Sequence, residues 1–201
     1  MDKHIFIELS DLFAKHGFTL YMIGGTSRDY LLAKEVFDYD FVTDATPEEM
    51  HQFLDRADYT FAKFGTIRMN YKKQKVDIVT LRIEGEYVDY RHPKNIKYVR
   101  DIALDYVRRD FTINALYIDR DFVVHDFAGG LDDLNNGIIR LIGNPDKRLI
   151  EDPLRILRAE RFAIKLGFTI EKTTKDAMER HRHLLTKVNP DKIREEENKR
   201  K

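Results

Sequence analysis

The hydrophobic pattern of this chain changes from mixed helix and strand periods to helical periods alone, and that change limits the possible folds more than any other feature. Through about residue 140 the apolar residues switch between helical spacing and strand alternation, whereas from about Asp146 onward only helical patterns remain. The sequence therefore predicts an α/β (α+β) domain with a mixed sheet over residues 1–140. A helical domain is expected to follow over residues 141–201, with the boundary near residues 141–150.

The elements of the first domain can be placed from their patterns. Residues 4–17 predict a helix that closes on Gly17, and residues 60–82 predict a hairpin that turns at Lys72–Lys75. Other segments predict a buried strand ending in a glycine turn (18–25), a helix with Thr26 or Ser27 near its N-cap (26–34), a strand (38–44), a helix opened by Pro47 (47–57) and a solvated loop (84–106).

Composition excludes several classes of protein. Lys+Arg and Asp+Glu are balanced at 35 each, so a nucleic-acid partner would have to be held by a local patch. The absence of cysteine excludes disulfides and thiolate metal sites. The first residues resemble an amphipathic helix and not a signal peptide, and no apolar run approaches the roughly 20 residues that span a bilayer. We therefore expect a soluble, cytoplasmic protein with no membrane association and no obligate protein partner.

A glycine pair and two aspartates lie close together in the segment GGTSRDYLLAKEVFDYDFVTD (24–44). Glycines between a strand and a helix allow the backbone to approach a phosphate, and Gly25 and Arg28 are the expected phosphate ligands. Asp38 and Asp40 are i and i+2 in a strand, so both carboxylates point to one face and repel each other unless a cation joins them. Mg²⁺ is usually held by one or two carboxylates plus substrate phosphates. The alternative interpretation is a turn followed by a solvated polar strand face.

A third carboxylate would complete a two-metal site, in which ions roughly 4 Å apart clamp the attacking and leaving oxygens. Asp77 is the best candidate, because its strand could run beside the strand of the aspartate pair. The alternative is an ordinary aspartate on an edge strand.

Several segments together resemble one known family. Residues 24–45 look like the first motif of class II CCA-adding enzymes and bacterial poly(A) polymerases, members of the polymerase-β-like nucleotidyltransferases. RRDFTINAL (108–116) is similar to their second motif, and EDPLRILRAERFAIKLGF (151–168) resembles their nucleobase-selecting motif. Residues 125–143 match the intervening segment, and VNPDKIREEENK (188–199) weakly resembles the neck-stiffening motif. The resemblance implies a nucleotidyltransferase head followed by a helical neck.

The second motif carries candidate nucleotide ligands. Asp110 and Asn114 are four residues apart, a spacing that puts them on one face of a helix, and the alternative is an exposed amphipathic helix. The resemblance implies that Arg109 contacts the nucleotide while Asp110 and Asn114 bind its ribose. The 2′-hydroxyl is the group that would distinguish an NTP from a dNTP.

The third motif spaces Asp152, Arg155, Arg158 and Arg161 by three residues, roughly along one helical face. Such a pattern is commonly a surface ion pair. Alternatively, a carboxylate and a guanidinium can read the Watson–Crick edge of cytosine or adenine, because both bases carry an exocyclic amine. The resemblance implies this template role for Asp152 and Arg155, with Arg158 and Arg161 facing the triphosphate.

The family implies an enzyme that uses Mg²⁺ to add CMP and AMP from CTP and ATP to the 3′ end of tRNA, releasing pyrophosphate. A bacterial poly(A) polymerase and a non-catalytic nucleotide- or RNA-binding module are the alternatives. Full-length relatives continue into body and tail domains, so we expect the chain to represent a head and neck without them. Its length does not decide between a natural and an engineered short form.

Overall fold

The computed structural model describes residues 3–85 and 94–199 and divides the chain into two compact units. The first unit consists of Met1–Ile83, Ile96–Arg108 and Asn114–Phe127, and the second of Glu84–Asn95, Arg109–Ile113 and Ala128–Lys201. The units therefore interleave along the chain, whereas the predicted domains 1–140 and 141–201 are continuous. That assignment of domains stays a prediction.

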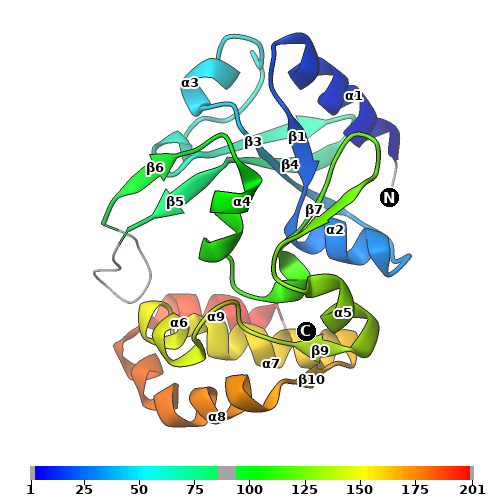
Figure 1. Ribbon diagram of the computed structural model, residues 1–201. Helices are drawn as coiled ribbons and strands as arrows, with labels where there is room; N and C mark the ends of the chain where they lie inside the picture. Colours follow the sequence, from blue (N-terminus) through cyan, green and yellow to red (C-terminus); the bar gives the residue numbers. More distant parts are fainter. Residues whose placement is uncertain (1–2, 86–93, 200–201) are drawn as a thin grey trace. The chain divides into compact units, whose positions relative to one another are not determined.

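A six-stranded mixed sheet forms the centre of the first unit, in the order β3-β4-β2-β1-β7-β8 (Figure 1). Strands β2 and β4 are parallel, and every other neighbouring pair is antiparallel. The strands are β1 (Leu20–Met22), β2 (Asp38–Thr43), β3 (Thr66–Tyr71), β4 (Gln74–Thr80), β7 (Leu116–Ile118) and β8 (Val124–Asp126). A separate two-stranded sheet joins β5 (Arg82–Glu84) to β6 (Ile96–Tyr98).

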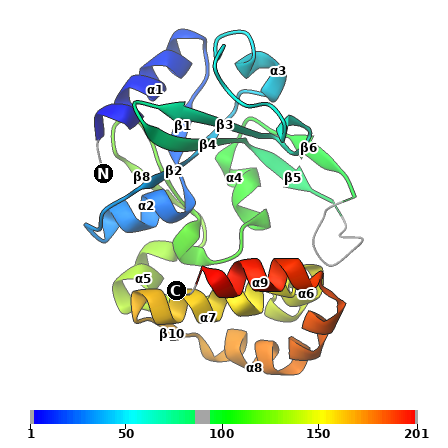
Figure 2. The ribbon, with the colours of Figure 1, turned by 180° about the vertical axis from the view of Figure 1, so that it is seen from behind.

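The helices of the first unit are α1 (Lys3–Lys15), α2 (Gly24–Leu31), α3 (Pro47–Met50) and α4 (Ile102–Asp105). It also contains 3₁₀ turns at Ala62–Phe64 and Tyr106–Arg108. A further 3₁₀ turn, Thr112–Asn114, begins in the second unit and ends in the first. Figures 1 and 2 show α1 and α3 on one side of the sheet and α4 on the other. The main core lies on the α1 side, where Phe6 and Phe13 pack on Phe41 and Ile78. A smaller core on the opposite face joins Val42 and Leu81 to Ile102 of α4.

Most predicted elements of the first unit are confirmed. Helix α1 ends just before Gly17, whose φ is +83°, and the β3–β4 hairpin turns at Lys72 and Lys73, both with positive φ. The N-cap prediction is wrong, because α2 begins at Gly24 and its N-cap is Ile23. Helix α3 ends at Met50 and not at 57, since the amides of Gln52 and Phe53 donate to carbonyls three residues back and tighten the chain into turns.

Residues 86–93 lie outside the described residues and include part of the predicted loop at 84–106. The remainder of that segment is more regular than predicted, since it contains β6 and α4. Asp101 caps α4 by accepting a hydrogen bond from the amide of Ala103.

The second unit is mainly helical, as the periodicity predicts. Its helices are α5 (Gly130–Asn136), α6 (Pro145–Glu151), α7 (Leu154–Leu166), α8 (Lys172–His181) and α9 (Pro190–Asn198), with a 3₁₀ segment at Arg182–Lys187. Figures 1 and 2 show α9 beside α7, and Leu154 and Leu157 of α7 pack against Val188 and Ile193. One feature departs from the helical prediction: β10 (Thr169–Ile170) pairs in parallel with β9 (Ile138–Ile139).

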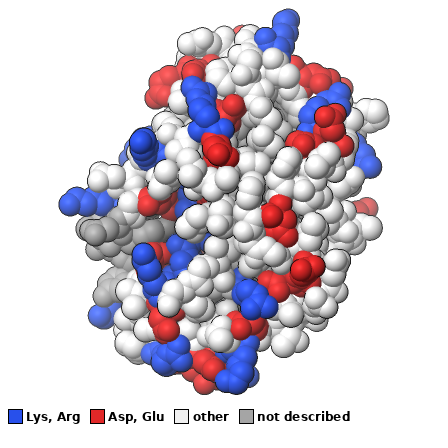
Figure 3. Space-filling model, in the orientation of Figure 1, with Lys and Arg blue, Asp and Glu red and all other residues white. Residues whose placement is uncertain are grey.

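Acidic and basic side chains are interspersed on the face shown in Figure 3, as expected from the balanced composition. Within the described ranges 3–85 and 94–199, we find no helix with the length and apolar character needed to cross a bilayer.

Candidate active site

Three predicted site residues lie on two neighbouring strands of the first unit. Strands β2 and β4 run parallel with Asp40 directly opposite Asp77, and Asp38 opposite Lys75. Residues directly opposite each other in a sheet project from the same face, and so do residues i and i+2 of one strand. Asp38, Asp40 and Asp77 therefore share one face, on the end of the sheet away from the α4 core. The prediction that the Asp77 strand runs beside the aspartate pair is confirmed.

The first turn of α2 fixes the backbone of β2 at this point, where β1 has ended. Ile23 N donates to Asp40 O (3.1 Å), and Asp40 N donates to Thr26 Oγ1 (2.7 Å). The same Thr26 hydroxyl donates to Asp38 O (3.2 Å) and is fully buried. One side chain thus satisfies backbone groups of both aspartates, and its use in this role explains why Thr26 does not cap α2.

Gly24 and Gly25 lie against the Asp40 carboxylate. A Cβ on either glycine would stand 3.4–3.5 Å from Asp40 Oδ2, and Gly24 also has a φ of +65° that other residues rarely adopt. The N-terminus of α2 carries partial positive charge, which favours an anion at this position. The glycines therefore allow a carboxylate and a helix N-terminus to approach closely.

Asp77 lies between a carboxylate and a cation on the same face. Arg68 Nε of β3 is 3.5 Å from Asp77 Oδ1, with the two side chains 51% and 42% exposed. Partial burial raises the pKa of Asp77, as does the charge of Asp38, while Arg68 opposes the shift. Asp38 and Asp77 lie on the same face of paired strands, where a cation would relieve the repulsion between their charges.

The donor set suits Mg²⁺, since the carboxylates are hard oxygen ligands and Mg²⁺ takes one or two of them from a protein. Within the described part of the chain, however, no three acidic or histidine side chains are close enough to enclose a metal ion. The residues present therefore fit a Mg²⁺ site in which the protein supplies two carboxylate ligands and the substrate supplies further oxygen ligands.

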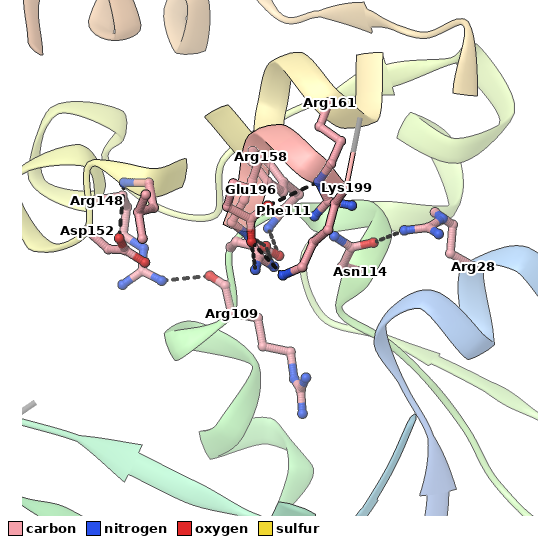
Figure 4. Close-up of polar contacts among 12 residues, drawn as sticks. Arg28, Arg109, Phe111, Asn114, Arg148, Asp152, Arg158, Arg161, Glu196 and Lys199 are labelled. Carbon is pink, nitrogen blue, oxygen red and sulfur yellow. Dashed lines mark hydrogen bonds and ion pairs between the residues drawn. The ribbon is translucent and has the colours of Figure 1, made fainter. Parts of the chain in front are cut away.

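Arg28 does not lie in solvent beside the glycines. Its side chain is buried, bonds to Asp29 through Nε (2.8 Å), and donates from Nη1 to Asn114 Oδ1 over 2.8 Å (Figure 4). Arg28 thus links the first motif to Asn114 of the second motif, and both partners belong to the first unit. This contact brings the two motifs together in the fold, and the separation of 86 residues between Arg28 and Asn114 gives no sign of it in the sequence.

The helix predicted across Asp110 and Asn114 is not formed. Phe111 makes a β-bridge with Leu141, Ile142 N donates to Asp110 O (3.0 Å) and Thr112 N donates to Arg140 O (3.0 Å). Residues 110–112 are therefore extended beside residues 140–142, and Asp110 and Asn114 belong to different compact units. A β-bridge at Phe111 and the 3₁₀ turn at Thr112–Asn114 take the place of the α-helix, and residues 111–114 are all buried.

Asp110 forms a partly buried ion pair within the second unit. Arg158 Nε donates to Asp110 Oδ2 over 2.9 Å, and its Nη2 contacts the same oxygen. Burial favours the protonated acid, but the Arg158 charge prevails and lowers the pKa of Asp110 to about 2. The Asp110 charge in turn raises the pKa of Arg158, so the pair remains ionised throughout the physiological range.

Glu196 of α9 extends this arrangement, as Figure 4 shows. Its carboxylate accepts from Arg161 Nε (3.1 Å) and from Lys199 Nζ (3.0 Å), and lies 4.0 Å from Arg158 Nη1. Although burial opposes ionisation, these three cations lower the pKa of Glu196. Arg158 and Arg161 are therefore held on the α9 side of α7 by an internal carboxylate.

Asp152 and Arg155 do not share a helical face, contrary to the prediction. Pro153 separates two helices: Asp152 is the C-cap of α6, and α7 begins at Leu154, whose amide donates to Asp152 Oδ1 (3.1 Å). Arg155 is 4% exposed and donates from Nη1 to Arg148 O (2.7 Å). The two residues remain neighbours, joined by Arg155 N to Asp152 O (3.2 Å).

Arg109 is anchored through its backbone, whose carbonyl accepts from Arg148 Nη2 (2.7 Å). Its side chain extends away from Arg148 in Figure 4. Sequence reasoning missed Thr26, Arg148 and Glu196. Two of them carry a signal in the sequence: Thr26 directly follows a strand-ending Gly-Gly, and Glu196 is three residues after Ile193 on the packed face of α9.

Two family models match the chain. Residues 20–140 match the family described as "Poly A polymerase head domain", and residues 167–199 match "Probable RNA and SrmB- binding site of polymerase A". The first match covers both motifs that contribute to the first unit, and the second covers α8 and α9.

Similar proteins include a CCA-adding enzyme from Lactobacillus helveticus (strain DPC 4571), 41% identical over 90% of this chain and 45% of that protein. Another, from Staphylococcus haemolyticus (strain JCSC1435), is 42% identical over 82% of this chain and 41% of the relative. The chain thus spans less than half the length of these relatives.

Solved structures of CCA-adding enzymes are also similar to this chain. The CCA-adding enzyme of Bacillus stearothermophilus in complex with CTP superposes with a TM-score of 0.87 and 30% identity, over 96% of this chain and 47% of that one. The Thermotoga maritima CCA-adding enzyme complexed with tRNA has a TM-score of 0.80 and 28% identity, over 98% and 46%. The predicted fold class, with its mixed-sheet head and helical continuation, is confirmed.

Proposed function

Because this chain belongs to the poly A polymerase head domain family, we propose that it is the catalytic part of a template-independent RNA nucleotidyltransferase of the CCA-adding type. It would transfer CMP and AMP from CTP and ATP to the 3′ end of tRNA and release pyrophosphate. The observation that carries the proposal is the shared sheet face of Asp38, Asp40 and Asp77, with the glycine turn of α2 against Asp40.

Asp38 and Asp40 would hold Mg²⁺, with Asp77 as the third carboxylate of the face. When bound, the ion would lower the pKa of the RNA 3′-hydroxyl and neutralise charge on the α-phosphate. The protein itself keeps the two aspartates fixed, because Thr26 ties both of their backbones to α2. The first turn of α2, beginning at Gly24 and Gly25, would direct its N–H groups to the phosphates.

The role proposed for Arg28 changes with the structure. A buried guanidinium bonded to Asp29 and Asn114 is suited to orienting Asn114 and not to holding a triphosphate directly. Asn114 would then bind the ribose, with Arg28 as its positioning residue. Arg109 keeps its proposed role as a nucleotide ligand.

In the second unit, Asp152 and Arg155 would read the nucleobase. The Asp152 carboxylate accepts hydrogen bonds and so favours the exocyclic amine of cytosine or adenine, while the Arg155 guanidinium only donates. Arg158 and Arg161 would bind phosphates, and in doing so would give up part of their contact with Glu196. Asp110 would act mainly by keeping Arg158 ionised and in place.

Relatives named as CCA-adding enzymes favour CCA addition over poly(A) synthesis. The test is to incubate the protein with Mg²⁺ and a tRNA that lacks its 3′-terminal CCA, supplying each NTP singly and then CTP with ATP. Among the NTPs supplied singly, we expect only CTP to be incorporated. When CTP and ATP are supplied together, we expect one AMP to be added after CMP. Repeated AMP incorporation from ATP alone would indicate a poly(A) polymerase. Failure to incorporate any nucleotide, with RNA or nucleotide binding intact, would overturn the enzyme assignment in favour of a binding module.

A further inference from the structure

A row of three charged side chains crosses the sheet of the first unit. Asp40 of β2 is opposite Asp77 of β4, and Asp77 is opposite Arg68 of β3. Because partners directly opposite each other share a face, Arg68 lies on the carboxylate face, one strand beyond Asp77. Neighbouring strands are about 4.8 Å apart, so Arg68 stands roughly two strand spacings from Asp40. Strand β3 is at the edge of the six-stranded sheet formed by the described residues.

Arg68 is held in place by an aromatic side chain. Its guanidinium carbon lies 4.5 Å from the centre of the Phe61 ring, which is 39% exposed. The Phe61 segment is fixed to β3 by a backbone pair, in which Asp58 N donates to Arg68 O and Arg68 N donates to Asp58 O (3.1 Å). An arginine stacked on an aromatic ring keeps its planar fork of donors directed to one side.

The ion pair with Asp77 does not account for this arrangement. At 3.5 Å, and with both side chains about half exposed, such a pair contributes little to folding. The guanidinium remains accessible on the face where the proposed reaction takes place. Exposed arginine combined with exposed aromatic surface is the chemistry that binds single-stranded nucleic acid.

We propose that Arg68, stacked on Phe61, binds a backbone phosphate of the single-stranded 3′ end of the RNA acceptor. This rests on the proposed function, because the 3′-hydroxyl must reach Asp38 and Asp40, and the preceding phosphate then lies within reach of the next cation along the sheet. Lys75, opposite Asp38, is also exposed on this face but is not stacked on a ring in the described structure. Arg68 is thus the cation held for bidentate contact with a phosphate.

The test measures RNA binding, and not only turnover. A labelled single-stranded oligoribonucleotide is titrated with the protein at several KCl concentrations, without NTP. For single strands, each phosphate contact contributes about −0.7 to the slope of log K against log salt. Arg68→Ala should reduce the slope by about 0.7 and weaken binding about tenfold at low salt. Arg68→Lys should keep the slope and lose part of the affinity, because it retains the charge without the planar fork.

Arg120→Ala is the matched control, since Arg120 forms a similar exposed pair with Asp11 in the same unit. It should leave slope and affinity unchanged, and thermal melting should show that all variants fold. If Arg68→Ala binds RNA with the wild-type slope, or if the wild type does not bind the oligoribonucleotide, the inference is wrong. If the slope changes as expected but no variant, including the wild type, incorporates nucleotide, the RNA contact stands and the proposed function fails.

Discussion

Arg28 and Asn114, 86 residues apart in the sequence, are joined by a 2.8 Å hydrogen bond from Nη1 to Oδ1. A guanidinium can only donate, so the amide oxygen of Asn114 must face Arg28 and its amide nitrogen must face elsewhere. The arginine of the first motif therefore determines which end of the Asn114 amide is directed to a ligand.

Asn114→Asp tests this orientation. An aspartate keeps an oxygen for Arg28 but replaces the donating amide nitrogen with a second acceptor. If Asn114 donates to a ribose oxygen, the preference for CTP over dCTP should fall about tenfold, with little change in melting temperature. The measurement is the ratio of kcat/KM for the two substrates. Asn135→Asp, on an exposed part of α5, is the control, and an unchanged ratio in Asn114→Asp would contradict the ribose role.

The Asp110–Arg158 pair should make stability depend on acid pH. The folded pKa of Asp110, about 2, lies below its ordinary value of 3.8. The stabilisation is therefore complete above pH 3.8 and is lost as the pH falls through about 2. A shift of this size corresponds to roughly 2 kcal/mol. Urea unfolding of the wild type and Asp110→Asn between pH 2 and 7 should show a difference that shrinks as the pH falls. A constant difference would contradict this assignment.

Glu196→Gln should destabilise the second unit. The substitution leaves the partly buried Arg161 beside a neutral amide, and breaking a hydrogen bond to a charged group usually costs about 1.5–3 kcal/mol. Glu195→Gln is a close control, because Glu195 is exposed and pairs with Lys192 at 2.8 Å. Chemical denaturation should separate the two variants by at least about 1 kcal/mol. Equal stability would show that the buried carboxylate does not hold α9 to α7.

Asp152→Ala should relax the choice of nucleobase without a large loss of stability. Removing the acceptor that favours an exocyclic amine should let UTP compete with CTP, with discrimination falling roughly ten- to a hundredfold. Single-nucleotide incorporation of all four NTPs measures this directly. Asp176→Ala, which removes an exposed partner of Lys172, should leave the ratios unchanged. Wild-type CTP/UTP and ATP/GTP ratios in Asp152→Ala would refute the template role.

Arg155→Ala should behave differently from Asp152→Ala. The Arg155 side chain is buried and bonded to the C-terminal turn of α6, so its loss should lower the melting temperature as well as the incorporation of CTP and ATP. The sequence pattern alone treated the two residues as equivalent members of one helical face.

The sequence predicted what depends on local periodicity. The alternation of DYDFVTD defined β2 and the shared direction of Asp38 and Asp40, and the hairpin pattern placed Asp77 on a strand that could pair with it. The motifs identified the family before any contact was known. These features are encoded within a few residues, so they could be found without tertiary structure.

Features that depend on tertiary pairing could not be predicted. Residues 110–112 were assigned to a helix because Asp110 and Asn114 are four apart, but their backbone pairs with residues 140–142. Pro153 separates Asp152 from the helix of Arg155, a break that the three-residue spacing conceals. Burial of Arg28 likewise depends on Asn114, whose distance in the sequence gives no indication of contact.

The role of Asp38 and Asp40 is tested by single-turnover extension of a tRNA lacking its 3′ end, in saturating Mg²⁺ and CTP, by the wild type and by Asp40→Asn. The substitution is nearly isosteric and should preserve the hydrogen bond from the Asp40 backbone amide to Thr26, so melting should change little. Asp55→Asn, at an exposed position of the same unit, is the control. We predict that extension by Asp40→Asn falls by at least about a thousandfold, because one of the carboxylates proposed to hold the metal is lost. Extension at a rate near that of the wild type would show that Asp38 and Asp40 do not form the catalytic centre.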